Sequence, residues 1–343
     1  MAARKPKICF DRVLPEDMAR PQAKRRAGGA MRAVFEFRKM WMNGTTLRVR
    51  FLGGTPQQQA KVKAEGVIWT QFANLNFEFN NAADAEIRIS FNEDDGAWSY
   101  VGTDCTGIPR NQATMNLGFM DPGVVAHEFG HAIGLGHEHQ NPKGGIEWNE
   151  PAVIKDLGGP PNSWSPEETR HNVLNKYTVD QIRGTQFDPD SIMLYAFPAK
   201  WTLNGIATKS NKSLSALDRS FIASVEAYPG RNATTPLPGP VVLAVNAAKA
   251  TSAAIGVPGE EDAYTFNAAT AAKYVIETTG ATDVVMKLFG PNSQTALLAE
   301  DDDSGAGTNA RIQRDLIPGK YFIQIRHFNK QGGTGSYKIQ VKK

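Results

Sequence analysis

Four of the six histidines in the chain fall within thirteen residues, His127–His139, with the sequence HEFGHAIGLGHEH. His127 and His131 are four residues apart, so on a helix their imidazoles share one face and both can bind one metal ion. A catalytic zinc ion needs a third protein ligand and an open position for water. Gly134 can adopt the positive φ that ends a helix and turns the chain back, which brings His137 to the same ion. We therefore expect His127, His131 and His137 to bind Zn²⁺.

Glu128 follows the first of these histidines and supplies the base that hydrolysis needs. Zinc lowers the pKa of a bound water toward ~7, and the carboxylate is placed to take the proton of that water. The residues fit H-E-x-x-H-x-x-G-x-x-H, a pattern that arises by chance in on the order of 10⁻⁵ of such chains. His139 lies outside the pattern. We expect it beside the site or on the surface, because a fourth protein ligand would close the position for water.

The sequence around these residues has mixed α and β character. Thr45–Gly54 and Ala85–Phe91 alternate apolar and polar residues, which predicts half-buried strands. Pro56–Leu75 has the spacing of a helix with proline in its first turn. The segment Asp121–Leu135 is predicted to be the helix that carries the histidines, with Asp121 as its N-cap. Leu214–Pro229 is predicted as another helix, capped by Ser215.

The length of 343 residues and a change in composition predict two domains. The proline-rich stretch RNATTPLPGP, residues 231–240, is expected to be a linker. After it, short alternating runs separated by Gly, Asn, Asp and Pro predict an all-β sandwich at residues 241–343. We expect an α+β protein, with an N-terminal arm or pro-segment-like region at 1–40. Residues 41–230 would form the catalytic domain, a twisted mixed sheet with long helices.

The charge balance and the apolar runs argue against some classes of partner. The chain has 38 basic and 35 acidic residues, a net charge of +3, which gives no reason to invoke nucleic acid. No apolar run is long enough to span a bilayer, and the N-terminus lacks the apolar core of a secretory signal. We expect no nucleic-acid partner, no membrane span and a monomer.

With these residues in view, the chain resembles the astacin-type metzincin peptidases over about Trp41–Pro229. Glu138 matches the acidic residue that follows the third histidine in that family. DPDSIMLYAFP, residues 188–198, resembles the family's Met-turn, S-I-M-H-Y. This implies that Met193 forms the apolar floor under the zinc. It also implies that Tyr195 is a fifth zinc ligand that swings away to stabilise the transition state.

A second stretch resembles the edge strand that binds substrate in astacins. GAWSYVGTD, residues 96–104, resembles the family pattern G-C-x-S-x-V-G. An exposed edge offers unpaired N–H and C=O groups, so an extended peptide can add to it as a strand. The resemblance therefore implies that Trp98, Ser99 and Tyr100 pair with an antiparallel substrate.

The resemblance implies a zinc-dependent endopeptidase that hydrolyses peptide bonds in protein or peptide substrates, through a zinc-activated water with Glu128 as general base. Ala97 stands where astacins carry a disulfide cysteine, and Leu194 replaces the histidine of S-I-M-H-Y. These departures favour a bacterial-type relative. The alternative is a non-catalytic zinc-containing binding or adhesin protein that acts through its C-terminal sandwich. An intact Glu128 argues against it, because a structural site has no use for a base.

The C-terminal part, Pro240–Lys343, resembles the bacterial pre-peptidase C-terminal (PPC) domain in stretches such as LIPGKYFIQI and GTGSYKIQV. The resemblance implies a β-sandwich appended to a secreted peptidase, so we expect a secreted or extracellular protein. Some such domains bind calcium, and Asp301, Asp302 and Asp303 supply the oxygen ligands that Ca²⁺ prefers. The alternative, which we weigh equally, is that these residues form a solvated acidic turn without a metal ion.

The two cysteines, Cys9 and Cys105, leave several alternatives open. A disulfide between them would pin the N-terminal arm near the substrate strand, and we rank this first. A thiol outside any bridge, buried or exposed, comes second. Third, the Cys9 thiolate would occupy the open position on zinc and hold the enzyme latent until cleavage near Arg25 releases it.

Overall fold

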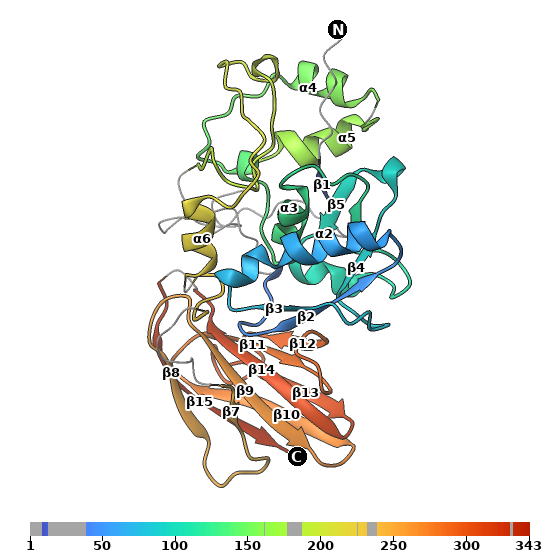
Figure 1. Ribbon diagram of the computed structural model, residues 1–343. Helices are drawn as coiled ribbons and strands as arrows, with labels where there is room; N and C mark the ends of the chain where they lie inside the picture. The colour runs from blue at the N-terminus through green and yellow to red at the C-terminus, as the bar shows by residue number, and fades with distance from the viewer. Residues whose placement is uncertain are drawn as a thin grey trace. The chain divides into compact units, whose positions relative to one another are not determined.

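The computed structural model describes residues 9–12, 39–160, 162–176, 187–224, 226–231, 239–329 and 332–343. Most of the expected arm at 1–40 and of the expected linker at 231–240 lies outside these residues. The chain divides into two compact units between Arg231 and Asn232. Figure 1 shows the elements of both units, and each unit is described by itself. Among the described residues, no helix combines the length and the apolar character needed to cross a membrane.

The first unit is built on a six-stranded mixed sheet. The strand order is β1-β5-β6-β4-β2-β3, and all neighbours are parallel except β5 and β6. The strands are β1 (Phe10–Arg12), β2 (Thr46–Phe51), β3 (Asn76–Glu78), β4 (Ile87–Ser90), β5 (Ala97–Tyr100) and β6 (Met115–Leu117). Apolar side chains of β2 and β4 alternate into the core, as their sequence pattern predicts.

Two helices pack together against this sheet (Figure 1). Helix α2 (Pro56–Gly66) begins with a capping box, in which the Thr55 hydroxyl accepts from the N–H of Gln58. It is shorter than the predicted Pro56–Leu75, because a 3₁₀ turn, η2 (Val67–Gln71), replaces its continuation. The Phe129 ring would lie 2.8 Å from a Cβ at Gly66, so the absence of a side chain lets the two helices approach.

Helix α3 (Val124–Ala132) carries the first two histidines. It begins two residues later than predicted, because Gly123, with φ of 96°, is the N-cap and Asp121, the predicted N-cap, lies in the preceding turn. The Trp69 indole donates to the carbonyl of Ala126 at 2.7 Å, and the Phe129 ring packs edge-on against Phe77 at 4.9 Å. The helix is therefore fixed between the sheet and η2.

Shorter elements complete the unit. The segment after α3 contains α4 (Glu150–Leu157), α5 (Pro166–Thr169), a π-turn η6 (Arg170–Leu174) and α6 (Ala216–Ile222). Ser215 caps α6 as predicted, since its hydroxyl accepts from the N–H of Asp218. The remaining 3₁₀ turns are η3 (Glu93–Asp95), η4 (Gly102–Gly107), η5 (Glu138–Gln140) and η7 (Ala199–Trp201). The helices are shorter than the long ones we expected. The longest described helix, α2, has 11 residues.

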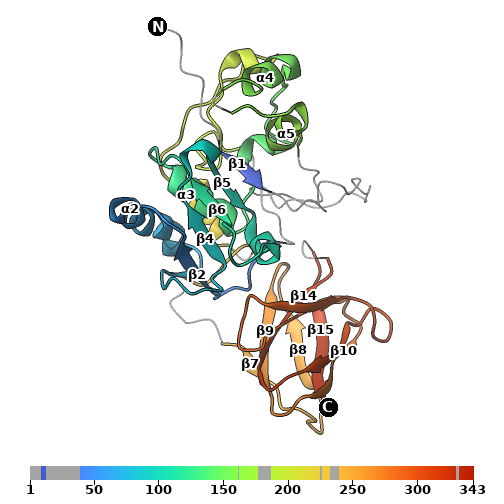
Figure 2. The ribbon, with the colours of Figure 1, turned by 90° about the vertical axis from the view of Figure 1, so that its right-hand side faces the viewer.

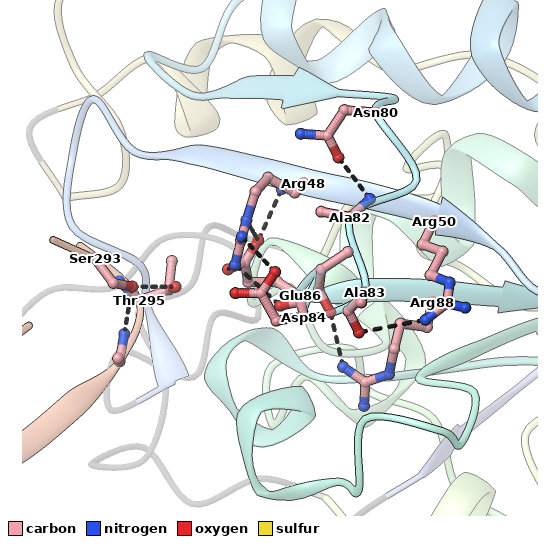
Figure 3. A network of polar contacts seen from close by, with 12 residues as sticks. Arg48, Arg50, Asn80, Ala82, Ala83, Asp84, Glu86, Arg88, Ser293 and Thr295 are labelled. Carbon is pink, nitrogen blue, oxygen red and sulfur yellow. Dashed lines mark hydrogen bonds and ion pairs between the residues drawn. The ribbon is translucent and has the colours of Figure 1, made fainter. Parts of the chain in front are cut away.

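Charged side chains brace the neighbouring strands β2 and β4 (Figure 3). The Arg48 guanidinium contacts Glu86 at 2.7 Å and Asp84 at 2.8 Å, and this contact lowers the pKa of Asp84. Arg88 is buried and donates to the backbone carbonyls of Ala85 at 2.8 Å and Gln112 at 2.7 Å. Both arginines therefore tie these strands to the loops around them.

The second unit is an all-β sandwich. Figure 2 shows its two sheets face to face, with strand orders β13-β10-β15-β8 and β12-β11-β14-β9-β7. Their inward side chains form one apolar core that includes Phe266, Tyr274 and Tyr321. The strands are β7 (Val241–Val242), β8 (Thr251–Ile255), β9 (Glu261–Ala268), β10 (Ala272–Gly280), β11 (Val284–Phe289), β12 (Leu297–Asp301), β13 (Arg311–Leu316), β14 (Gly319–His327) and β15 (Gly335–Lys342). The α+β prediction with a C-terminal sandwich is confirmed.

Candidate metal and catalytic site

The three histidines of the pattern converge at one point. His127 and His131 lie one turn apart on α3, and Gly134, with φ of 103°, turns the chain so that His137 returns to them. The Nε2 atoms are 3.0 Å apart for His127 and His131, 3.1 Å for His131 and His137, and 3.3 Å for His127 and His137. All three side chains are buried.

Backbone carbonyls orient two of these imidazoles. His127 Nδ1 lies 2.8 Å from the oxygen of Ile192, and His131 Nδ1 lies 2.7 Å from the oxygen of Leu135. A neutral imidazole that donates from Nδ1 has a lone pair on Nε2, so the Nε2 atoms of His127 and His131 are acceptors that repel each other unless a cation lies between them. Tetrahedral zinc with Zn–N bonds of about 2.0–2.1 Å places its ligand nitrogens roughly 3.3 Å apart. The observed spacing and the nitrogen donor set both fit zinc.

Glu128 lies beside this cluster and is completely buried. A carboxylate oxygen of Glu128, a ring nitrogen of His127 and the Cys9 sulfur all lie within 4.8 Å of one another. The carboxylate is therefore next to the point where the three Nε2 atoms meet, in surroundings with little water.

The loop that contains Met193 packs against α3 at Gly130. A Cβ at Gly130 would lie 2.5 Å from the Met193 sulfur, so this glycine inside the histidine pattern lets Met193 pack directly against α3. Ile192, whose carbonyl orients His127, donates its N–H to Asp218 Oδ2 at 2.9 Å. The Ser191 hydroxyl donates to Asp218 Oδ1 at 2.7 Å. The sequence analysis did not identify Gly130 or Asp218, because no local pattern in the sequence indicates that either residue contacts the loop around Met193.

Glu138 joins the third histidine to the same loop. Its backbone N–H donates to the oxygen of Met193 at 3.0 Å. Its carboxylate accepts from the N–H of Asp188 and from the amide of Asn141, each at 3.0 Å. Burial raises the pKa of Glu138 to about 8. This acidic residue therefore fixes the backbone on both sides of the histidine cluster.

Tyr195 lies over the cluster. Its ring is 4.1 Å from that of His137 and stacks on the ring of His139 at 4.3 Å. Its hydroxyl donates a hydrogen bond to the carbonyl oxygen of Cys9. His139 is buried and its Nε2 contacts the carbonyl oxygen of Asn172 at 3.0 Å, so it lies beside the site and not on the surface.

The predicted substrate strand β5 is not an open edge. Strand β1 pairs with it in parallel, with Phe10 opposite Trp98 and Arg12 opposite Tyr100 (Figure 2). Trp98 and Ser99 are buried and Tyr100 is half-buried. The expectation of an unpaired edge is therefore wrong for this form of the chain, because a segment that is distant in sequence occupies it.

The expected disulfide is also wrong. Cys9 and Cys105 are both buried, and no disulfide joins them. The parallel register places Cys9 beside the start of β5, near Ala97, whereas Cys105 lies in η4 beyond the other end. Strand β5 alone spans roughly 10 Å at about 3.3 Å per residue, which exceeds the Cα separation a disulfide can bridge. Burial raises the pKa of the Cys105 thiol.

The predicted calcium ligands form no convergent group. Within the described part of the chain, two groups bring three potential ligand atoms together, His127 with His131 and His137, and Cys9 with His127 and Glu128. Asp301 instead accepts from the backbone N–H groups of Ser304 at 3.1 Å and Arg311 at 2.7 Å. Its carboxylate therefore stabilises the turn after β12.

Comparisons with known proteins agree with this geometry. The astacin family of peptidases matches residues 35–147, and the bacterial pre-peptidase C-terminal domain matches residues 260–327. A solved structure of myroilysin is 36% identical, with a TM-score of 0.54 over 56% of this chain and 98% of that one.

Two animal proteins are also similar to this chain. Blastula protease 10 of Paracentrotus lividus is 34% identical over 37% of this chain, and zinc metalloproteinase dpy-31 of Caenorhabditis elegans is 26% identical over 48% of it. The aligned parts cover 20% and 27% of those two proteins. With the histidine cluster, the Met193 loop and a myroilysin likeness that spans nearly all of that protein, the chain belongs to the astacin family of peptidases.

Proposed function

We propose that this protein is a zinc-dependent endopeptidase that cleaves protein or peptide substrates. The observation that carries the proposal is the convergence of three Nε2 atoms at 3.0–3.3 Å beside a buried carboxylate. His127, His131 and His137 would hold the zinc. A zinc ion bound there would polarise the scissile carbonyl and make water a stronger acid.

Glu128 acts as the general base in this proposal. Its carboxylate takes a proton from the attacking water and then delivers it to the amine that leaves. Burial beside His127 keeps bulk water away, so the proton transfers between the carboxylate and the reacting groups. The neighbouring residues Ala126 and Phe129 of α3 are buried in the core, which fixes the part of the helix that carries Glu128.

Tyr195 stabilises the negative charge that develops on the substrate oxygen. Its hydroxyl already donates to a peptide carbonyl oxygen, that of Cys9, and the same O–H can donate to the oxyanion of a bound substrate. His139 supports the ring by stacking on it. The hydroxyl becomes available when the Cys9 segment leaves.

The substrate would lie along β5, antiparallel to it and near Ser99. Strand β1 shows that the backbone groups of β5 accept an added strand at this edge. A peptide substrate can therefore add to the same edge in the antiparallel direction once β1 is displaced.

Cys9 is the candidate latch of this enzyme. The thiol lies with His127 and Glu128, its carbonyl holds the Tyr195 hydroxyl, and the following residues fill the substrate edge. A thiolate is a strong zinc ligand, so Cys9 would occupy the position that water needs. Cleavage within the segment that follows β1, near Arg25, would allow it to leave.

The test is cleavage of casein or a quenched fluorescent peptide after the arm has been cut with trypsin. We expect activity that a chelator abolishes and added zinc restores. Glu128→Ala should retain zinc and the fold but lose nearly all turnover. Appreciable cleavage by Glu128→Ala would exclude the role of Glu128. Zinc binding by the wild type without any cleavage would favour a non-catalytic binding or adhesin protein instead.

A further inference from the structure

Arg12, the last residue of β1, is held by two residues of the catalytic unit. Its Nη2 lies 3.0 Å from each carboxylate oxygen of Asp95. Its guanidinium lies 3.7 Å above the centre of the Trp98 ring. A carboxylate and an indole face together recognise the charge and the flat shape of a guanidinium.

Contacts within the catalytic unit help to position the two recognising residues. The Trp98 indole donates to Asp95 Oδ2 at 2.8 Å, so the carboxylate and the ring fix each other. Asp95 ends η3, and Gly96, with φ of 64°, leads directly into β5. The Trp98 ring also packs edge-on against Tyr100 at 6.0 Å. Because these contacts do not involve β1, we expect the arrangement to persist when β1 departs.

The position of Arg12 relative to the reaction centre follows from the register of β1. Cys9 lies with His127 and Glu128, and Arg12 comes three residues later in a strand paired with β5. An extended strand advances about 3.3 Å per residue, so Arg12 is roughly 10 Å along the edge from Cys9. A substrate that runs antiparallel to β5 has the opposite direction to β1. The substrate residue at the position of Arg12 would therefore lie on the amino side of the cleaved bond.

We propose that Asp95 and Trp98 form a specificity subsite for a basic side chain of the substrate, about three residues to the amino side of the cleaved bond. This inference rests on the proposed peptidase function. The arm fills the subsite with its own arginine, so it covers both the reaction centre and a recognition point. Arginine fits better than lysine, because its planar guanidinium lies flat on the indole while Nη2 donates to the carboxylate.

The side chains of Arg12 and Asp95 are each 37% exposed, so a substrate side chain can reach the subsite from solvent. This exposure also limits its strength. Solvent weakens the charged hydrogen bond between a basic side chain and Asp95, so we expect a preference of about fivefold to tenfold.

The experiment uses the full chain, cut with trypsin in the arm and dialysed, with four peptides that differ only at the third residue before the cleaved bond. These carry arginine, lysine, glutamine or glutamate there. We expect kcat/KM for the arginine peptide to exceed that for the glutamine peptide about fivefold to tenfold. Asp95→Asn should remove this difference, and Asp95→Lys should shift the preference to glutamate. Asp94→Asn, an exposed residue of the same turn, is the matched control and should keep the arginine preference.

A binding measurement separates this inference from the proposed function. Trypsin-cut Glu128→Ala should bind the arginine peptide about fivefold to tenfold more tightly than the glutamine peptide in calorimetry, whether or not the wild type turns over. Equal binding of the two peptides, or binding of neither, would overturn the subsite. Normal discrimination in binding with no cleavage by the wild type would contradict only the peptidase function.

Discussion

The Tyr195 hydroxyl donates a hydrogen bond to the backbone carbonyl oxygen of Cys9. The same tyrosine packs its ring on His137 at 4.1 Å, so one side chain contacts both the histidine cluster and the N-terminal segment. The N-terminal segment therefore accepts the hydrogen bond of the same hydroxyl that we propose donates to the substrate oxyanion. Its removal would open the site and release that donor in one event.

Replacing Tyr195 by phenylalanine tests the proposed role of this hydroxyl. The ring and its packing on His139 remain, so zinc content and thermal stability should change little. In the trypsin-cut protein, kcat should fall about 10²-fold or more with little change in KM, because the hydroxyl acts mainly in the transition state. Steady-state kinetics on a short peptide measure both constants. An unchanged kcat would show that Tyr195 contributes packing alone.

The latch predicts different behaviour for the two cysteines in the uncut protein. Cys9→Ser should raise the rate of peptide cleavage before trypsin treatment, because a serine hydroxyl is a much weaker zinc ligand than a thiolate. Cys105→Ser is the matched control, since it also replaces a buried thiol but lies in η4. It should leave the latent rate unchanged. If Cys9→Ser stays as inactive as the wild type until it is cut, the latch does not depend on the thiol.

The division after Arg231 predicts that the first unit cleaves short peptides without the sandwich. A truncated protein that ends at Arg231 keeps the hydrogen bonds that the Arg231 side chain donates to the backbone oxygens of Ala73 and Leu75. It also keeps Tyr228, whose hydroxyl donates to the Ile133 oxygen at 2.8 Å and accepts from the Trp41 N–H at 3.1 Å. We expect kcat/KM on a short peptide close to that of the full chain.

A shorter protein that ends at Ser224 is the control for this truncation, because it lacks Tyr228 and should unfold at a lower temperature. A protein ending at Arg231 that folds and binds zinc but cannot cleave a short peptide would contradict the independence of the first unit. Circular dichroism and zinc content distinguish this result from simple unfolding.

Local sequence signals predicted the parts of the site that lie close together in the chain. The spacing of His127, His131 and His137 determines their convergence, because helix geometry and one glycine turn are local properties. The resemblance identified the loop around Met193, which does pack under α3. The alternating runs after the linker likewise predicted the strands of the sandwich.

Long-range contacts were not predictable from those signals. Strand β1 has only three residues and pairs with a strand more than eighty positions later. A run this short shows no periodic pattern from which the strand or its partner could be predicted. The expected bridge between Cys9 and Cys105 failed for the same reason, because it depended on the register of that pairing. Asp218 contacts the Met193 loop from a separate helix. Secretion, a monomeric state and calcium binding stay predictions.

Asp218 should influence zinc affinity although it lies outside the ligand set. Its carboxylate holds the Ser191 hydroxyl and the Ile192 N–H, and the Ile192 oxygen in turn orients His127. Asp218→Ala would leave the buried Ile192 N–H without an acceptor and loosen this loop. Loss of a partner that orients a metal ligand typically weakens metal binding about 10–100-fold, which competition with a chromophoric chelator measures.

Ser215→Ala is the control for Asp218→Ala, because Asp218 also takes part in the capping box of α6. Removing this hydroxyl, which also donates to Asp188 Oδ2 at 2.6 Å, should lower stability by about 1 kcal/mol but leave zinc affinity unchanged. Asp218→Asn keeps one oxygen that can accept from the Ile192 N–H, so its zinc affinity should lie between those of the wild type and Asp218→Ala. Equal zinc affinity in all four proteins would show that His127 keeps its orientation without the Asp218 carboxylate. In that case the rigidity of α3 and the packing of Met193 against Gly130 would suffice to position the first ligand.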